Sequence, residues 1–161
     1  MQIDQIMTLF NYHWAMTVRL IEGAAQIEES NYKKELDYGR GSVHDLLFHI
    51  LAADHSWRIA LHSGRQQLGL DNSDFPDLDS VRALLEDEER AWQEYFTDLT
   101  DAALQEEVSL KSLRGHTRNI PLWRVLVHLV LHGMQHQSEL SRLLTEQDQS
   151  PGDIDFIFFS E

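Results

Sequence analysis

Apolar side chains recur every three or four residues in four long segments of the sequence, and this spacing restricts the fold more than any other feature. Residues three or four positions apart share one face of an α-helix, so each segment predicts a helix with one apolar face. The segments cover about residues 3–28, 43–61, 81–99 and 121–144. Four such helices are typical of an all-α four-helix bundle. The long connections between them leave the order of the helices open.

Shorter signals mark the ends of the helices and the segments between them. The stretch DYGRGS breaks the first helical pattern, and Ser42 is a good N-cap with Asp45 three residues later. Pro121 fits the first turn of the last helix. Residues 100–108 favour one short helical turn, residues 109–121 a loop or a short extended pair, and residues 150–159 an apolar tail that docks on the bundle. Since there is no repeat and no linker, we predict one domain over residues 1–161.

Composition argues against several classes of protein. The chain has no cysteine, which excludes disulfides, thiolate zinc sites and cysteine nucleophiles. Its net charge of −14 and its scattered basic residues argue against a nucleic-acid partner. The first ten residues do not have the basic start of a signal peptide, and no apolar run approaches the roughly 20 residues of a membrane span. We therefore expect a cytoplasmic protein that does not bind membranes.

The last helical segment contains histidines at regular spacing. In VLVHLVLHGMQHQSEL, residues 125–140, they are His128, His132 and His136. At about 100° per residue, His136 falls inside the apolar face and His132 at its edge, whereas His128 lies further out. Side chains at i and i+4 are neighbours that can share one metal ion. The geometry therefore favours the pair His132 and His136 over the pair His128 and His132.

A third histidine of the same kind lies on the second helical segment. His49 borders its apolar face, whereas His44, His55 and His62 point to the outward side, and His13 on the first segment is marginal. Two imidazoles from one helix and one from another would leave coordination positions open, as catalytic metals need. Three neutral nitrogens suit Zn²⁺, Ni²⁺ or Fe²⁺. Histidines hydrogen-bonded in the core, or lining an apolar pocket, are the alternatives at this point.

Each metal-binding imidazole needs a partner for its other ring nitrogen. Asp45 lies one turn before His49, and Glu139 lies three residues after His136. The alternative interpretations, which we favour from sequence, make Asp45 a helix-start acid and Glu139 a solvated side chain. The large aromatic residues are more typical of a core than of a cofactor pocket: Phe10, Trp14, Trp57, Trp92 and Phe96.

Three stretches resemble the DinB family of helical-bundle metalloenzymes. They are LFNYHWAMTVRLIEG, GSVHDLLFHILAADHSW and PLWRVLVHLVLHGMQHQSELSRLL, and the resemblance covers most of the chain. The resemblance implies a four-helix bundle with His49, His132 and His136 as metal ligands, the set that the helix geometry also favours. The family motif usually continues HRGQ, whereas this chain has HQSE. Gln137 and Ser138 therefore stand where arginine and glycine are usual, which puts the arginine's interaction in doubt.

The resemblance also implies what such a site does. Members of the family are often homodimers, so the resemblance implies a homodimer here. Characterised members include transferases and isomerases that use low-molecular-weight thiols such as mycothiol or bacillithiol. We therefore expect a divalent-metal-dependent enzyme, with a thiol S-transferase acting on a small electrophile as the first hypothesis. A metal-dependent hydrolase uses the same site with another nucleophile. A non-catalytic stress-response bundle that binds a metal or a ligand, and a purely structural bundle, are the alternatives.

Overall fold

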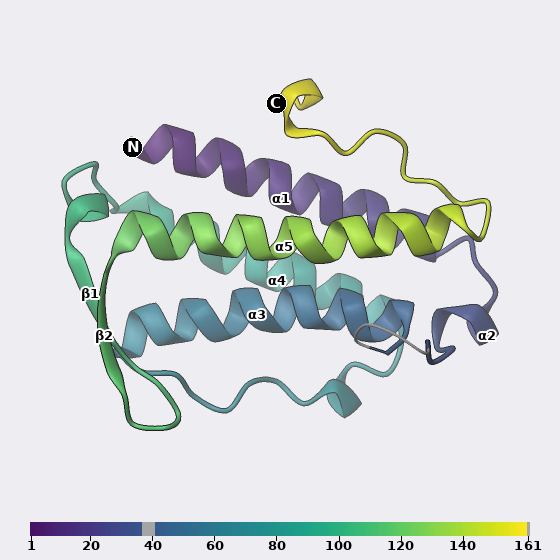
Figure 1. Cartoon of the computed structure of the whole chain (residues 1–161), viewed down its shortest axis with the longest axis horizontal. Helices are drawn as coiled ribbons and strands as arrows, with labels where there is room; N and C mark the ends of the chain where they lie inside the picture. Colours follow the sequence, from purple (N-terminus) through teal and green to yellow (C-terminus); the bar gives the residue numbers. More distant parts are fainter. Residues whose placement is uncertain (37–40, 161) are drawn as a thin grey trace.

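Four long helices form the body of the protein (Figure 1). The computed structural model describes residues 1–36 and 41–160. The long helices are α1 (Ile3–Ala24), α3 (Val43–Ser63), α4 (Leu78–Thr97) and α5 (Leu122–Thr145). The shorter elements are α2 (Glu29–Tyr32), the strands β1 (Glu107–Lys111) and β2 (Thr117–Pro121), and three single 3-10 turns at Asn72–Asp74, Ala103–Gln105 and Phe156–Phe158. The predicted four-helix bundle is confirmed, with a small hairpin added.

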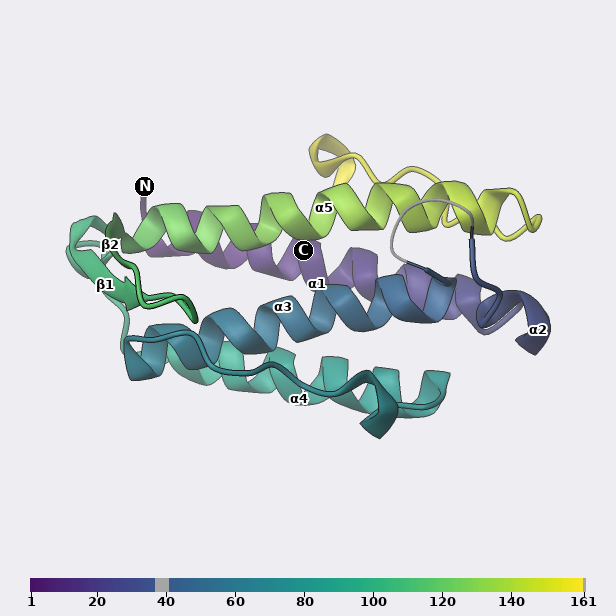
Figure 2. The same cartoon turned by 60° about the horizontal axis from the view of Figure 1, so that its bottom comes forward.

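The helices do not follow an up-down-up-down order. Helix α1 packs on α5, α5 on α3, α3 on α4, and α4 on α1. Figures 1 and 2 show that α3 and α4 run in the same direction, as do α1 and α5. The connection over residues 64–77 therefore runs back along α3 before α4 begins. This return path covers a face of α3 that a short loop would have left open.

The core contains an aromatic cluster at the contact between α1 and α4. Phe10 is fully buried, and its ring centroid lies 5.1 Å from that of Trp92 and 4.9 Å from that of Phe96. Trp14 packs edge-on against Phe10 at 5.5 Å. Each aromatic pair at such a distance stabilises the fold by about 0.5–1.5 kcal/mol beyond the contribution of its buried area. These four residues are core residues as predicted, whereas Trp57 is only partly buried.

The start of α3 is fixed by the predicted capping residues. Ser42 Oγ accepts a hydrogen bond from the Asp45 backbone N–H, and the Asp45 carboxylate accepts one from the Ser42 N–H at 2.9 Å. Burial raises the pKa of Asp45, but hydrogen bonds from Ser42, Asn72 and His44 outweigh it and hold this pKa below its ordinary value. Asp45 is thus a capping residue, the alternative that the sequence favours. Residues 37–40 of the predicted break lie outside the described residues.

Two predicted boundaries differ from the structure. The first helix ends at Ala24 instead of continuing to about residue 28, and the chain turns so that Ile27 and Tyr32 pack back onto the core. Pro121 is the N-cap of α5 and not a residue of its first turn. The reason is that Pro121 pairs with Glu107 as the last residue of β2, which holds its backbone extended.

The hairpin β1–β2 lies across the ends of α3 and α5 (Figure 2). It is the extended pair that the sequence allowed, and the short turn at Ala103–Gln105 before it was also expected. Leu110 pairs with Arg118, and Val108 pairs with Ile120. Leu110 is buried in a small cluster with Ala60 and Val125. The hairpin is thereby attached to both helices.

The C-terminal tail docks on α1 through its backbone. Tyr12 donates a hydrogen bond to the Ile154 carbonyl at 2.5 Å, and Arg19 donates one to the Asp153 carbonyl at 2.9 Å. Ile157 and Phe158 nevertheless remain 81% and 70% exposed, so the expected burial of the apolar cluster is only partial. Among the described residues, no helix combines the length and apolar character needed to cross a membrane.

Candidate metal centre

Three imidazoles meet where α3 packs on α5. One ring nitrogen from each of His49, His132 and His136 lies within 4.8 Å of the other two. His49 Nε2 and His132 Nε2 are 3.3 Å apart. The ring centroid of His136 lies 4.7 Å from that of His49 and 4.7 Å from that of His132. The i, i+4 spacing aligns the pair on α5, and the packing of α3 brings His49 to it.

The burial of these imidazoles follows the helix geometry. His136 is buried, with 4% of its surface exposed, whereas His49 and His132 are half-buried. His128, one turn before His132, is exposed, and its ring centroid is 5.9 Å away from that of His132. The cluster is therefore closed on the side of His136 and accessible beside the other two rings.

Glu139 determines which nitrogen of His136 faces the cluster. The carboxylate lies 3.0 Å from His136 Nδ1. Because a carboxylate only accepts, this Nδ1 carries the proton and the lone pair is on Nε2. Glu139 is therefore a partner of His136, although its side chain also remains 42% exposed as the favoured interpretation expected.

The donor set fits a divalent metal ion. With metal–nitrogen bonds of about 2.0–2.1 Å, a tetrahedral site has its nitrogens about 3.3–3.4 Å apart. The 3.3 Å separation of His49 Nε2 and His132 Nε2 matches that value. Within the described part of the chain, the group consists of imidazoles and includes no carboxylate. Three nitrogen donors with one open side are what a metal with exchangeable positions needs.

His13 belongs to a separate buried cluster. It is completely buried, and its Nε2 lies 2.9 Å from Asp54 Oδ2, itself 2% exposed. The Gln137 amide nitrogen donates to Thr17 Oγ1 and lies 3.2 Å from His13 Nδ1. A Cβ added at Gly133 would overlap the His13 ring. The helical pattern of α1 alone put His13 at the margin of the buried face, because the partners that surround it come from α3 and α5.

Gln137 and Ser138 have different environments. Gln137 is fully buried and also donates to the His13 carbonyl at 2.9 Å, so it joins α5 to α1. Ser138 is exposed and donates to the Met134 carbonyl at 2.8 Å within its own helix. Neither side chain belongs to the group of three histidines.

Two histidines that the sequence placed on the outward side of α3 have partners from other elements. His44 is buried, and its Nε2 lies 2.7 Å from the Phe75 carbonyl in the returning connection. His55 Nδ1 lies 2.6 Å from Glu88 of α4, a buried carboxylate that also accepts two hydrogen bonds from Arg58 at 2.8 Å. The outward face of α3 is covered, which the sequence alone did not show. As predicted, neither histidine joins the cluster of three.

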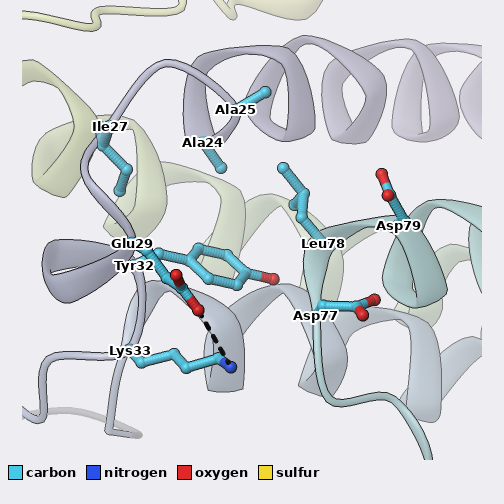
Figure 3. Close-up of a pocket in the computed structure, with 9 residues that line it drawn as sticks. All are labelled: Ala24, Ala25, Ile27, Glu29, Tyr32, Lys33, Asp77, Leu78 and Asp79. Atoms are coloured by element: carbon cyan, nitrogen blue, oxygen red, sulfur yellow. Dashed lines mark ion pairs between the residues drawn. The ribbon is translucent and has the colours of Figure 1, made fainter.

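A cavity of about 270 Å³ at the α2 end of the bundle lacks histidines (Figure 3). Tyr32 lines it, and burial raises the pKa of this phenol, so its hydroxyl stays protonated. The lysine of the cavity lining is Lys33, whose Nζ lies 3.9 Å from Glu29 Oε1. Asp77 and Asp79 add negative charge to a wall that also contains Ala24, Ala25, Ile27 and Leu78. Its lining includes none of the three clustered histidines, so we assign it no part in the metal centre.

Comparison with known proteins supports this description. The model of the DinB family matches residues 1–161. Uncharacterized protein YizA of Bacillus subtilis (strain 168) is 24% identical over 154 residues, which is 94% of each chain. The structure of YfiT from Bacillus subtilis, described as a probable metal-dependent hydrolase with an unusual four-helix bundle topology, has a TM-score of 0.71 at 16% identity and covers 91% of this chain and 90% of its own. The DinB-like protein YjoA from the same species has a TM-score of 0.63 at 19% identity, covering 91% and 94%.

Proposed function

Because the chain belongs to the DinB family over residues 1–161, we propose that it is a divalent-metal-dependent enzyme with His49, His132 and His136 as ligands. The observation that carries this proposal is the convergence of three imidazole nitrogens within 4.8 Å, with no carboxylate in the group. Three protein donors leave at least one position of a tetrahedral site for water or substrate. Zn²⁺, Ni²⁺ and Fe²⁺ all accept imidazole, so the ligands do not select one of them.

The side chains around the site have distinct roles in this proposal. Glu139 holds His136 in the tautomer that presents Nε2 to the cluster. The half-buried edges of His49 and His132 leave the open side from which a small molecule enters. A bound divalent metal would lower the pKa of a water molecule or a thiol and so supply a nucleophile at neutral pH.

Hydrolysis is the first candidate reaction. It is supported by the similarity of the fold to YfiT, which is itself described as a probable metal-dependent hydrolase. Water would add to an electrophilic carbon, the leaving group would depart with the electron pair of the broken bond, and the released protons would pass to solvent and to that group.

Thiol transfer is the second candidate, and it is favoured because no carboxylate among the described residues joins the group of three histidines. Glu139, the carboxylate that contacts the cluster, is occupied by His136. A thiol with a lowered pKa is already deprotonated and needs no base. Its sulfur would form a bond to the electrophilic carbon while the leaving group departs with its electron pair and the thiol proton goes to solvent.

The metal site is tested by elemental mass spectrometry on tag-free protein reloaded with Zn²⁺ or Ni²⁺ and desalted. We expect about one metal per chain in the parent and none in a folded His49→Ala/His132→Ala/His136→Ala variant. A parent that stays metal-free contradicts the proposal. Loaded protein is then assayed with activated esters, and with thiols plus electrophiles. Metal binding without turnover in either assay would leave a non-catalytic metal-binding bundle.

Changing Glu139 to alanine should weaken metal binding by about 10- to 100-fold, because such supporting partners orient the ligand and raise its basicity. Glu139→Gln keeps an acceptor for His136 and should lose less. Competition with a chromophoric chelator measures both affinities. Glu146→Gln at the C-cap of α5 removes the same charge and serves as the control, since Glu146 pairs with Arg142. Equal affinities in all four proteins would show that Glu139 does not support the site.

A further inference from the structure

A second cavity, of about 650 Å³, lies between β2, the start of α5 and α3. Its lining includes Trp57, Arg118, Asn119, Ile120, Arg124 and His128. It is therefore formed by the hairpin and the two helices that carry the histidine cluster.

The charge of this cavity is opposite to that of the protein. The chain has 27 acidic and 13 basic residues, yet among the described residues the lining contains two arginines and no carboxylate. Across the part of the chain that the structure describes, no hydrogen bond or ion pair involves the guanidinium of Arg118 or Arg124. By contrast, Arg58, Arg90 and Arg142 each pair with a carboxylate. Two unpaired guanidiniums in one cavity favour an anionic ligand.

The hairpin directs Arg118 toward this cavity. Arg118 is paired with Leu110, and Ile120 with Val108. Directly paired residues of an antiparallel sheet have side chains on the same face. Leu110 is buried against Ala60 of α3 and Val125 of α5, so Arg118 lies on the face that meets the helices. Arg118 itself is exposed, so its guanidinium is accessible to a ligand from solvent.

The cavity reaches His128, one turn before His132 on α5, and its lining includes none of the three clustered histidines. Trp57 and His128 pack with ring centroids 5.4 Å apart, and His128 and His132 with centroids 5.9 Å apart. Arg124 and His132 are eight residues apart on α5, which is about 12 Å along the helix axis. A ligand whose anionic end contacts Arg124 therefore needs only a short body to bring its other end to the cluster.

We propose that this cavity binds a small organic anion, with a carboxylate or phosphate on Arg118 and Arg124 and an apolar body against Trp57 and Ile120. We further infer that such anions are the substrates of the neighbouring metal centre. This part of the inference rests on the proposed function. Arginine binds a carboxylate and a phosphate alike through two parallel hydrogen bonds, so the same two side chains could recognise either anion.

The test measures binding to metal-free protein by the shift of the Trp57 indole N–H resonance, assigned with a Trp57→Phe variant. The probes are phenylacetate, phenyl phosphate, the neutral phenylacetamide and inorganic phosphate. We expect at least one organic anion to bind about tenfold more tightly than the amide and inorganic phosphate. The tighter of phenylacetate and phenyl phosphate identifies the anionic group. Arg118→Gln and Arg124→Gln should each weaken that binding about tenfold.

Arg114→Gln is the matched control, because Arg114 lies in the exposed turn of the same hairpin and outside the cavity. Equal binding of amide and anions, or an equal loss in the Arg114 variant, overturns the inference. Metal content is measured on the same samples. Protein that binds metal but not the anions leaves the proposed function standing without this inference. Protein that binds the anions but no metal keeps the anion site and loses the proposed function.

Discussion

Changing His132 to alanine is expected to lower the affinity for Zn²⁺ by about a hundredfold to a thousandfold. Zinc binding by four ligands is worth roughly 10–16 kcal/mol, so one ligand accounts for about 2.5–4 kcal/mol. Each 1.4 kcal/mol is a factor of about ten in affinity. His132 is half-buried at the open edge of the cluster, so the variant should stay folded. Competition with a chromophoric chelator gives the affinity, and circular dichroism checks the fold.

His128→Ala is the matched control for this prediction. His128 is an exposed histidine one turn earlier on α5, and its ring contacts His132 without joining the group of three. Its removal should change the Zn²⁺ affinity by less than about threefold, well below the effect of losing a ligand. Equal losses in the two variants would mean that His128 completes a closed ligand shell, and a closed shell argues against catalysis.

Asp54→Ala is expected to reduce the free energy of unfolding by about 1–3 kcal/mol, because it leaves the buried His13 ring without its hydrogen-bond partner. Asp54 is 2% exposed and is bound to His13, which is completely buried. Urea denaturation of metal-free protein measures the loss, since a bound metal would add its own stabilisation.

Two variants show where this loss comes from. Glu86→Ala removes an exposed carboxylate of α4 and should change the stability by less than about 0.5 kcal/mol. The double variant His13→Leu/Asp54→Leu should be clearly more stable than Asp54→Ala, because apolar residues can replace a buried pair at little cost. In this double variant the Gln137 amide can still donate to the backbone carbonyl of residue 13 and to Thr17. A small loss in Asp54→Ala, equal to that in Glu86→Ala, contradicts the assigned role of the pair.

The fold and the histidine cluster were largely predictable because both depend on periodicity within single helices. Apolar spacing predicted four helices, and the same angular arithmetic placed His136 inside the apolar face and His132 at its edge, as the structure has them. His49 was found because it borders the face on which α3 packs. The capping pair of Ser42 and Asp45 was predictable for a related reason, since its hydrogen bonds span three residues.

What the sequence by itself determined, therefore, is the four long helices and the apolar face that each of them turns to the core. Only the tertiary structure decided which helices are neighbours, because long connections allow several orders. The return of residues 64–77 along α3 buries His44, and the parallel packing of α3 and α4 buries Glu88. The contact of α1 with α3 and α5 joins His13 to Asp54 and Gln137. The hairpin likewise brings Arg118 to Arg124, through a strand pairing that no helical period encodes.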